Sequence, residues 1–225
     1  MDVTVPSLVR IKPGALDKVG KYLAALGLRQ VAAFYGEGLE DRFRPRVEAS
    51  CREVGVTLLQ SSTLATTDAR ALFELSCTVV PEASGLLAVG GGRAVDGCKY
   101  MAHLLQRPLL ACPTLVSNDG FASPFASLTF DGRKRTVRTR MPLGVVVDTA
   151  VVAAAPERFH YSGVGDLLSN LTAIADWKSA FRHDGSYVDD FAVSLAQTAC
   201  DAFRHQPVQR PDDPACVAAL ANGLL

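Results

Sequence analysis

The sequence has no excess of either charge and no long apolar run. Lysine plus arginine and aspartate plus glutamate both number 23, so the formal net charge is zero. Such a balance argues against a protein that binds nucleic acid or another polyanion. No apolar run approaches the roughly 18 residues of a membrane span, and the first residues lack the basic-then-apolar pattern of a signal peptide. We therefore expect a cytoplasmic protein with no membrane or nucleic-acid partner.

The six cysteines include no Cys-x-x-Cys pair, the spacing typical of zinc ribbons and redox dithiols. Cys77, Cys98 and Cys112 lie in or beside apolar stretches, where a reduced thiol behaves as a small hydrophobe. The densest basic run, at 133–140, follows an Asp-Gly turn. We interpret it as a solvated hairpin in preference to a phosphate-binding patch.

Apolar segments predict an α/β fold for the first two thirds of the chain. Runs without polar alternation are typical of strands buried on both faces of a parallel sheet. They occur at 30–36, 56–60, 86–92, 108–114 and 143–149. Segments with helical periodicity lie between them, at 14–27, 38–50, 66–75 and 94–106. This alternation predicts a Rossmann-like parallel sheet with helices on both faces.

The pattern changes after Pro156. Helical periodicity continues at 166–181, 187–203 and 213–225, and no clear strand signal follows residue 155. The total of 225 residues allows one domain or two small ones, because domains average roughly 150 residues. We predict an α/β domain at 1–155 and a shorter, all-helical domain at 156–225.

Three segments carry the residues of a candidate site, and the first is the glycine turn at 88–99, "AVGGGRAVDGCK". Glycines between a strand and a helix let a phosphate approach the backbone amides at the helix N-terminus. The turn does not match a Gly-x-Gly-x-x-Gly fingerprint, since Val95 stands where the third glycine would be. From this segment alone, phosphate binding and a simple tight connection stay equally open.

The second segment, "PTLVSNDGFASPFAS" at 113–127, places hydroxyl residues and a turn after the next strand. Ligands of open parallel sheets bind beyond the carboxyl ends of the strands. Asp119 taken alone is explained as a turn residue before Gly120. The third segment, "SGVGDLLSN" at 162–170, is predicted as a loop that opens a helix. There Asp166 would cap the helix, hold a ligand, or do both.

Together, the motifs at 90–96, 113–124 and 162–177 resemble glycerol-1-phosphate dehydrogenases. These belong to the fold group of iron-containing alcohol dehydrogenases, glycerol dehydrogenases and dehydroquinate synthases. The likeness covers most of residues 5–205. It implies a metal-assisted, NAD- or NADP-dependent oxidoreductase that reduces dihydroxyacetone phosphate, a small phosphorylated substrate.

The resemblance also implies roles for individual residues. Asp119 would lie next to the substrate. Asp166 would contact the substrate and be the first protein ligand of a catalytic zinc or related divalent ion, which a carboxylate oxygen suits. The cofactor would be bound by Gly90, Gly91, Gly92, Arg93, Ala94, Val95, Asp96, Thr114, Leu115, Val116, Ser117 and Ser123.

The chain departs from the family pattern in its histidines. A catalytic metal site usually has three protein ligands, and the resemblance implies two histidines in downstream segments that this sequence lacks. We interpret its four histidines as surface or capping residues: His103, His160, His183 and His205.

The resemblance also indicates that only about half of the family's helical domain is present. We therefore expect a second copy or a complementing C-terminal chain to cover apolar helix faces. Candidate residues for such a face are Leu171, Ile174, Phe191 and Leu195.

Two alternative functions stay open. The missing histidines favour a degenerate member that keeps the nucleotide cleft without metal catalysis, and a dehydroquinate-synthase-like cyclase would use the same cleft. The sequence does not choose between NAD and NADP. Glu37 would contact the ribose 2′-hydroxyl or act as a helix-start carboxylate, and we favour the second.

Overall fold

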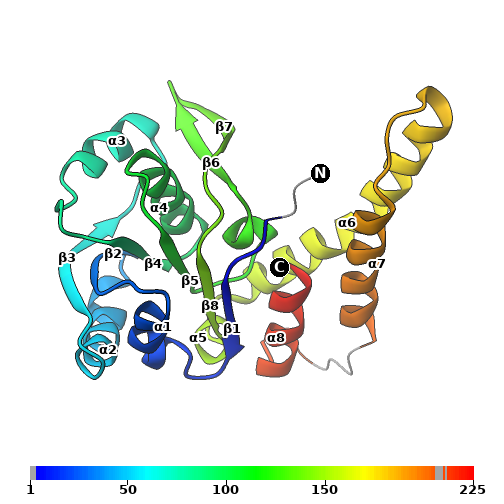
Figure 1. The fold of residues 1–225 in the computed structure, drawn as a ribbon. Helices are drawn as coiled ribbons and strands as arrows, with labels where there is room; N and C mark the ends of the chain where they lie inside the picture. Colours follow the sequence, from blue (N-terminus) through cyan, green and yellow to red (C-terminus); the bar gives the residue numbers. More distant parts are fainter. Residues whose placement is uncertain (1–3, 206–209, 211) are drawn as a thin grey trace.

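The computed structural model describes residues 4–205, 210 and 212–225. Its centre is a six-stranded parallel sheet with strand order β1-β8-β5-β4-β2-β3 (Figure 1). The strands are β1 (Leu8–Lys12), β2 (Gln30–Gly36), β3 (Thr57–Leu64), β4 (Gly85–Gly90), β5 (Leu109–Pro113) and β8 (Gly144–Asp148). The predicted Rossmann-like sheet is thereby confirmed.

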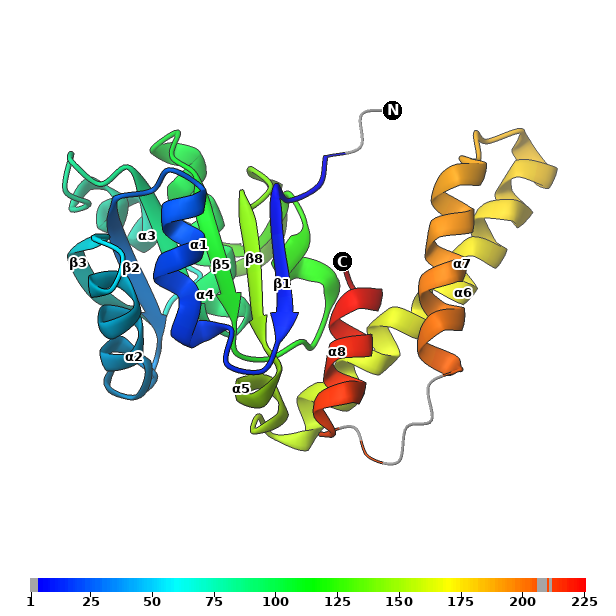
Figure 2. The ribbon, with the colours of Figure 1, turned by 60° about the horizontal axis from the view of Figure 1, so that its bottom comes forward.

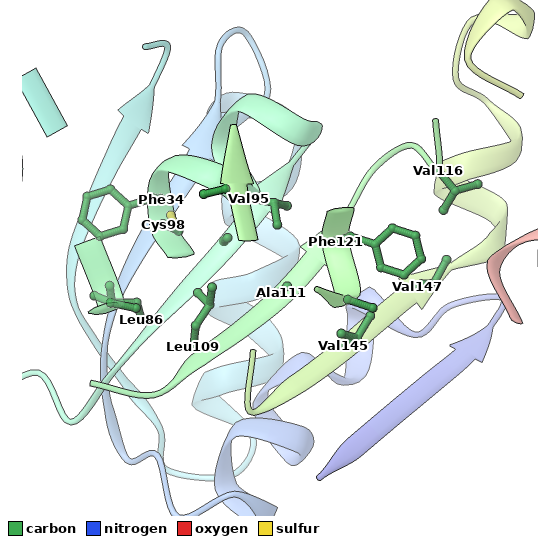
Figure 3. Close-up of a cluster of buried hydrophobic side chains, with 14 of the residues drawn as sticks. Phe34, Leu86, Val95, Cys98, Leu109, Ala111, Val116, Phe121, Val145 and Val147 are labelled. Carbon is green, nitrogen blue, oxygen red and sulfur yellow. The ribbon is translucent and has the colours of Figure 1, made fainter. Parts of the chain in front are cut away.

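Helices cover both faces of the sheet. Residues of β2 alternate between two hydrophobic clusters: Tyr35 packs in the cluster with the first two helices, and Phe34 in the cluster with the next two. Figure 3 shows Phe34 in the second cluster, with Val95 and Cys98 of the covering helix. The four helices are α1 (Val19–Ala25), α2 (Glu40–Arg52), α3 (Ala69–Cys77) and α4 (Gly92–Leu104).

An antiparallel hairpin packs against α4 and α3 and forms a separate two-stranded sheet (Figure 1). It consists of β6 (Phe125–Phe130) and β7 (Arg133–Arg138). Asp131 and Gly132 connect the strands, with φ angles of 48° and 75°. Positive φ at both central residues is the geometry of a tight hairpin turn. The basic residues of β7 are exposed, so the predicted solvated hairpin is confirmed.

The remaining α-helices form a second region, in which α6 and α7 extend away from the sheet (Figure 2). They are α5 (Thr149–Ala153), α6 (Glu157–Asp184), α7 (Asp190–Arg204) and α8 (Pro214–Gly223). Leu167 of α6, Cys200 of α7 and Leu220 of α8 are fully buried and belong to the same cluster as Phe34. The core is therefore continuous from the sheet into these helices, and a domain boundary at 155/156 stays a prediction.

The edge strand β1 and the short helix α5 were absent from the sequence-based prediction. The expected loop at 162–170 is wrong, since these residues lie inside the 28-residue helix α6. Within the described ranges, no helix combines the length and apolarity needed to cross a membrane.

Candidate active site

A cleft of about 390 Å³ opens at the carboxyl ends of the central strands. Its floor includes the glycine turn between β4 and α4 and the segment after β5, while the loop after β2 and the start of α6 form its walls. The lining residues are Gly36, Glu37, Leu39, Arg42, Phe43, Leu64, Gly91, Gly92, Arg93, Ala94, Thr114, Leu115, Ser117, Val151, Ala154, Ala155, Pro156 and Phe159. This is the position at which open parallel sheets bind ligands.

Gly90 and Gly92 of the turn have different surroundings. A Cβ on Gly90 would lie 2.8 Å from the Ala94 Cβ and 3.0 Å from the Gly36 nitrogen, so only glycine lets β2, β4 and α4 approach this closely. A Cβ on Gly92 would meet nothing within 4 Å. The first residue of α4 thus faces open space, where an anion can approach the amides of a helix N-terminus.

Lys99 of α4 holds the loop that follows β5. Its side chain is fully buried, and its Nζ donates hydrogen bonds to the carbonyl oxygens of Gly120, at 2.6 Å, and Phe125. It also forms an ion pair with the Asp96 Oδ1, at 2.8 Å. The other Asp96 oxygen accepts a hydrogen bond from the Ser127 amide at 3.1 Å. Burial lowers the pKa of Lys99, while the neighbouring Asp96 carboxylate acts in the opposite direction.

The two candidate catalytic carboxylates lie together beside this loop. The Asp119 amide donates a hydrogen bond to the Asp166 Oδ2 at 2.9 Å, although 47 residues separate them in sequence. The Ser162 hydroxyl donates to the Ser117 carbonyl at 3.0 Å, which ties α6 to the same segment. The pKa of Asp119 is raised, first by burial of its own carboxyl group and second by the nearby charge of Asp166.

Asp119→Asn is expected to raise the free energy of unfolding at pH 7. The gain should stay below about 1 kcal/mol, because Asp119 as a residue is exposed and solvent screens the repulsion from Asp166. A raised folded pKa means that the folded protein binds the proton more tightly than the unfolded chain, so stability falls as pH rises through that pKa. The gain should therefore vanish below the ordinary aspartate pKa of 3.8.

Urea unfolding across this pH range measures the effect, and Asp176→Asn on the exposed face of α6 is the control. An equal gain in the control variant, or a gain that persists at low pH, would contradict the raised pKa of Asp119.

The structure brings most of the predicted site residues to the cleft or to a small adjoining hollow lined by Val95, Asp96 and Asn118, among others. The predicted catalytic residues Asp119 and Asp166 do not line either space, and neither do three predicted cofactor contacts. Gly90 is buried between strands, and the Val116 side chain packs into the core beside Phe121 and Val147 (Figure 3). The Ser123 hydroxyl instead hydrogen-bonds within the loop, to the Gly120 and Phe125 carbonyls.

Asp166 does not cap a helix. It lies well inside α6, and neither Gly163 nor Gly165 has a positive φ angle. Gly163 instead serves close packing, because a Cβ there would lie 2.1 Å from the Val116 carbonyl oxygen. The two glycines thus resemble a loop in sequence but belong to a helix. One of them, Gly163, lets this helix pack closely against the segment after β5.

The interpretation of His160 as a surface or capping residue is wrong. Its side chain is fully buried, and within the described residues neither ring nitrogen has a hydrogen-bond partner. It shares the inward face of α6 with Gly163 and Leu167, at helical spacing. His103 is half-buried, whereas His183 and His205 are exposed as expected.

Glu37 does not start a helix either. It follows the last residue of β2, and the acidic residues in the first turn of α2 are Glu40 and Asp41. Its carboxylate forms an ion pair across the cleft with Arg93, at 3.5 Å.

Lys99 and Arg42 were not singled out in the sequence. For Lys99, the signal available in the sequence was its spacing of three residues from Asp96 on the same predicted helix.

A metal site is not complete in the described residues, which contain no group of three His, Cys, Asp or Glu side chains suited to a metal ion. Asp166 offers one carboxylate, and one of its oxygens already accepts the Asp119 amide. The residues present therefore do not by themselves fit a three-ligand catalytic metal.

The parallel sheet, the glycine turn at a helix N-terminus and a cleft beyond the strand ends define the class of nucleotide-binding α/β proteins. Residues 10–156 match the model of the iron-containing alcohol dehydrogenase family. The chain belongs to that family, as its motifs indicated.

Relatives agree with this assignment. The chain is 33% identical over 201 residues to a glycerol-1-phosphate dehydrogenase [NAD(P)+] of Methanosarcina mazei, covering 87% of this chain and 55% of the relative. It is 32% identical over 199 residues to the enzyme of the same name from Metallosphaera sedula, covering 86% and 55%. The chain thus spans about half the length of these relatives.

Solved structures share the fold. A probable glycerol dehydrogenase from Sinorhizobium meliloti 1021 superposes with a TM-score of 0.82 at 23% identity, covering 99% of this chain and 64% of that one. Sulfoacetaldehyde reductase from Bifidobacterium kashiwanohense, solved in complex with NAD+, gives 0.75 at 19% identity, covering 99% and 64%.

Proposed function

We propose that the chain is the nucleotide-binding part of an NAD(P)-dependent polyol-phosphate dehydrogenase that reduces dihydroxyacetone phosphate. One observation carries the proposal: in a family member, the open helix N-terminus at Gly92 lines the cleft after β4, and Asp119, hydrogen-bonded to Asp166 of α6, follows the neighbouring strand β5. The two relatives described above are named glycerol-1-phosphate dehydrogenase [NAD(P)+], and glycerol 1-phosphate is a polyol phosphate. In the reaction, a hydride passes from the reduced nicotinamide to the carbonyl carbon, and a proton to its oxygen.

The residues divide the work by position. The amides at the start of α4 receive the pyrophosphate. Thr114, Leu115 and Ser117, on the β5 side of that turn, line the nicotinamide half of the cleft. Asp119 and Asp166 contact the hydroxyl groups of the substrate, because paired carboxylates accept hydrogen bonds from a polyol.

We also infer that a helical segment outside residues 1–225 completes the enzyme, including any metal centre to which Asp166 contributes. Phe181, Phe191 and Leu195 are 55%, 64% and 58% exposed. Leu171 and Ile174, by contrast, are half-buried and buried. A groove of about 320 Å³ lies between α7 and α8, and its lining includes Leu195 and the small residues Ala199 and Gly223. Such a groove admits the close approach of another helix.

We place the protein in the cytoplasm. All six cysteines are free thiols, five of them buried, as is usual in reducing compartments.

Gly92→Glu is expected to weaken dinucleotide binding strongly while leaving the fold intact. The added carboxylate would enter the open space at the α4 N-terminus, repel the pyrophosphate and meet no protein atom near its Cβ. The dissociation constants of NADH and NADPH, measured by fluorescence titration, should rise at least about tenfold. Arg70→Glu on the exposed surface of α3 is the matched control and should bind as the wild type does.

Dihydroxyacetone phosphate-dependent oxidation of the reduced cofactor tests the reaction itself. We expect turnover in the presence of the complementing segment and zinc, and its loss in Asp166→Asn with nucleotide binding unchanged. Binding without turnover in the complemented protein would instead favour a degenerate nucleotide-binding module.

A further inference from the structure

Lys99 is the one buried cation among the lysines and arginines that the structure describes. A buried charge costs free energy unless it is fully paired, and apolar side chains in place of such a pair often leave a protein just as stable. Stability alone therefore does not explain a lysine at this position of α4. Its partners indicate what else it does.

The Lys99 ammonium has three N–H donors, and three acceptors surround it. Within α4 it pairs with the Asp96 Oδ1 at 2.8 Å. Its other two partners are the carbonyl oxygens of Gly120 and Phe125. The first belongs to the short 3-10 helix η2 (Asp119–Ala122), and the second begins β6. A single side chain thus joins the dinucleotide-binding helix to both ends of the loop after β5.

Two of these partners line the small hollow that adjoins the cleft. They are Asp96 of α4 and Gly120 of η2, whereas Lys99 does not line it. The lysine therefore ties two walls of the hollow together from behind them. The hollow shares Leu115 and Ser117 with the cleft, and on the proposed function these residues lie at the nicotinamide half. A nicotinamide ring bound there would lie beside both walls that Lys99 joins.

The charge of Lys99 also acts on the substrate side. Burial of the Asp119 carboxyl group, and then the charge of Asp166, raise the pKa of Asp119, while the Lys99 ammonium opposes both. It thereby favours the ionised form of Asp119, which lies in the same short helix as Gly120. The same ammonium thus supports a wall beside the ring and the charge of a carboxylate beside the substrate.

We propose that Lys99 is a positioning residue for hydride transfer. Through Asp96 and the Gly120 carbonyl it fixes the walls beside the nicotinamide ring, and through η2 it keeps Asp119 aligned with that ring. Lys99 itself contacts neither cofactor nor substrate. Because transfer requires the reacting atoms to lie about 3–3.5 Å apart, a loosened wall misplaces the ring. This inference rests on the proposed function and assigns the lysine to the nicotinamide half alone.

Lys99→Met should weaken the binding of NADH about five- to tenfold and that of ADP-ribose less than about twofold. ADP-ribose lacks the nicotinamide ring, so its binding does not depend on the walls that Lys99 joins. NADPH and its ring-free counterpart form a second pair. The ratio of the two dissociation constants is independent of protein stability, because a partly unfolded sample weakens both by the same factor. Lys99→Gln keeps a donor for one carbonyl but no charge, and it should weaken NADH about two- to fivefold.

Met101→Ala in the same helix is the matched control. Met101 is fully buried and lines neither the cleft nor the hollow, so this variant loses stability while its ratio stays at the wild-type value. Isothermal titration calorimetry of the purified chains measures both constants, and Lys99→Gln decides the matter if Lys99→Met does not fold.

A ratio of dissociation constants, NADH over ADP-ribose, that rises in the Lys99 variants and not in Met101→Ala supports the assignment. An unchanged ratio in the Lys99 variants overturns it and leaves the proposed function in place, since the dinucleotide still binds. A wild-type chain that binds neither NADH nor NADPH overturns both, and that result appears in the first titration.

Discussion

Lys99→Met is expected to lower the free energy of unfolding by about 3–5 kcal/mol, the cost of removing one partner from a buried charged network. The Lys99 side chain is fully buried and satisfies two backbone carbonyls as well as Asp96. Methionine fills a similar volume without a charge or donor. It would leave the Asp96 carboxylate and the carbonyls of Gly120 and Phe125 without that partner.

Urea unfolding followed by circular dichroism measures this loss. Lys134→Met in the exposed strand β7 is the matched control and should lie within about 0.5 kcal/mol of the wild type. Adding Asp96→Asn to Lys99→Met should recover part of the stability, because the uncompensated carboxylate is then gone. A loss below about 1 kcal/mol for Lys99→Met would show that the network contributes little.

Gly163→Ala is expected to destabilise the fold by about 1–3 kcal/mol, the usual range for an overpacked contact, or by more because the obstacle is backbone. The new methyl group would lie 2.1 Å from the Val116 carbonyl oxygen, and it would also approach a Leu220 methyl carbon at 3.1 Å. Helix α6 would have to move away from the segment after β5. Such a shift would separate Asp166 from the Asp119 amide.

Gly165→Ala is the matched control, two residues further along the same helix. Its Cβ would meet nothing within 4 Å. Alanine has the higher helix propensity, so this variant should equal the wild type or gain up to about 1 kcal/mol. Thermal unfolding of both variants decides the matter. Equal effects would mean that Gly163 is not a packing contact.

Buried strands were the part of the fold most accessible from sequence. Six of the seven residues of β2 are buried, so its run of apolar side chains was unambiguous. The edge strand β1 escaped prediction because its burial is incomplete and Arg10 and Lys12 interrupt the apolar pattern. Helix α5 has only five residues, too few to show a period, and depends on the Asp148 side chain capping the Ala150 amide.

The candidate site was only partly predictable, for a different reason. Motifs showed which segments carry polar side chains, but not which side chains meet. Glu37 and Arg93 come from the ends of neighbouring strands, and their ion pair is a product of strand order. Gly163 and Gly165 had the composition of a loop, because sequence does not reveal that the carbonyl of Val116 passes beside one of them.

The unbroken length of α6 couples two distant places in the molecule. Its 28 residues span about 42 Å at 1.5 Å per residue. One end contacts the segment after β5 at Gly163 and carries Asp166, while the other pairs with α7 far from the sheet, as Figure 2 shows. A helix of this kind bends only gently without a kink. A tilt of the outer helices would therefore also change the distance between Asp166 and the Asp119 amide, so the far end of α6 is mechanically coupled to the alignment of the two carboxylates.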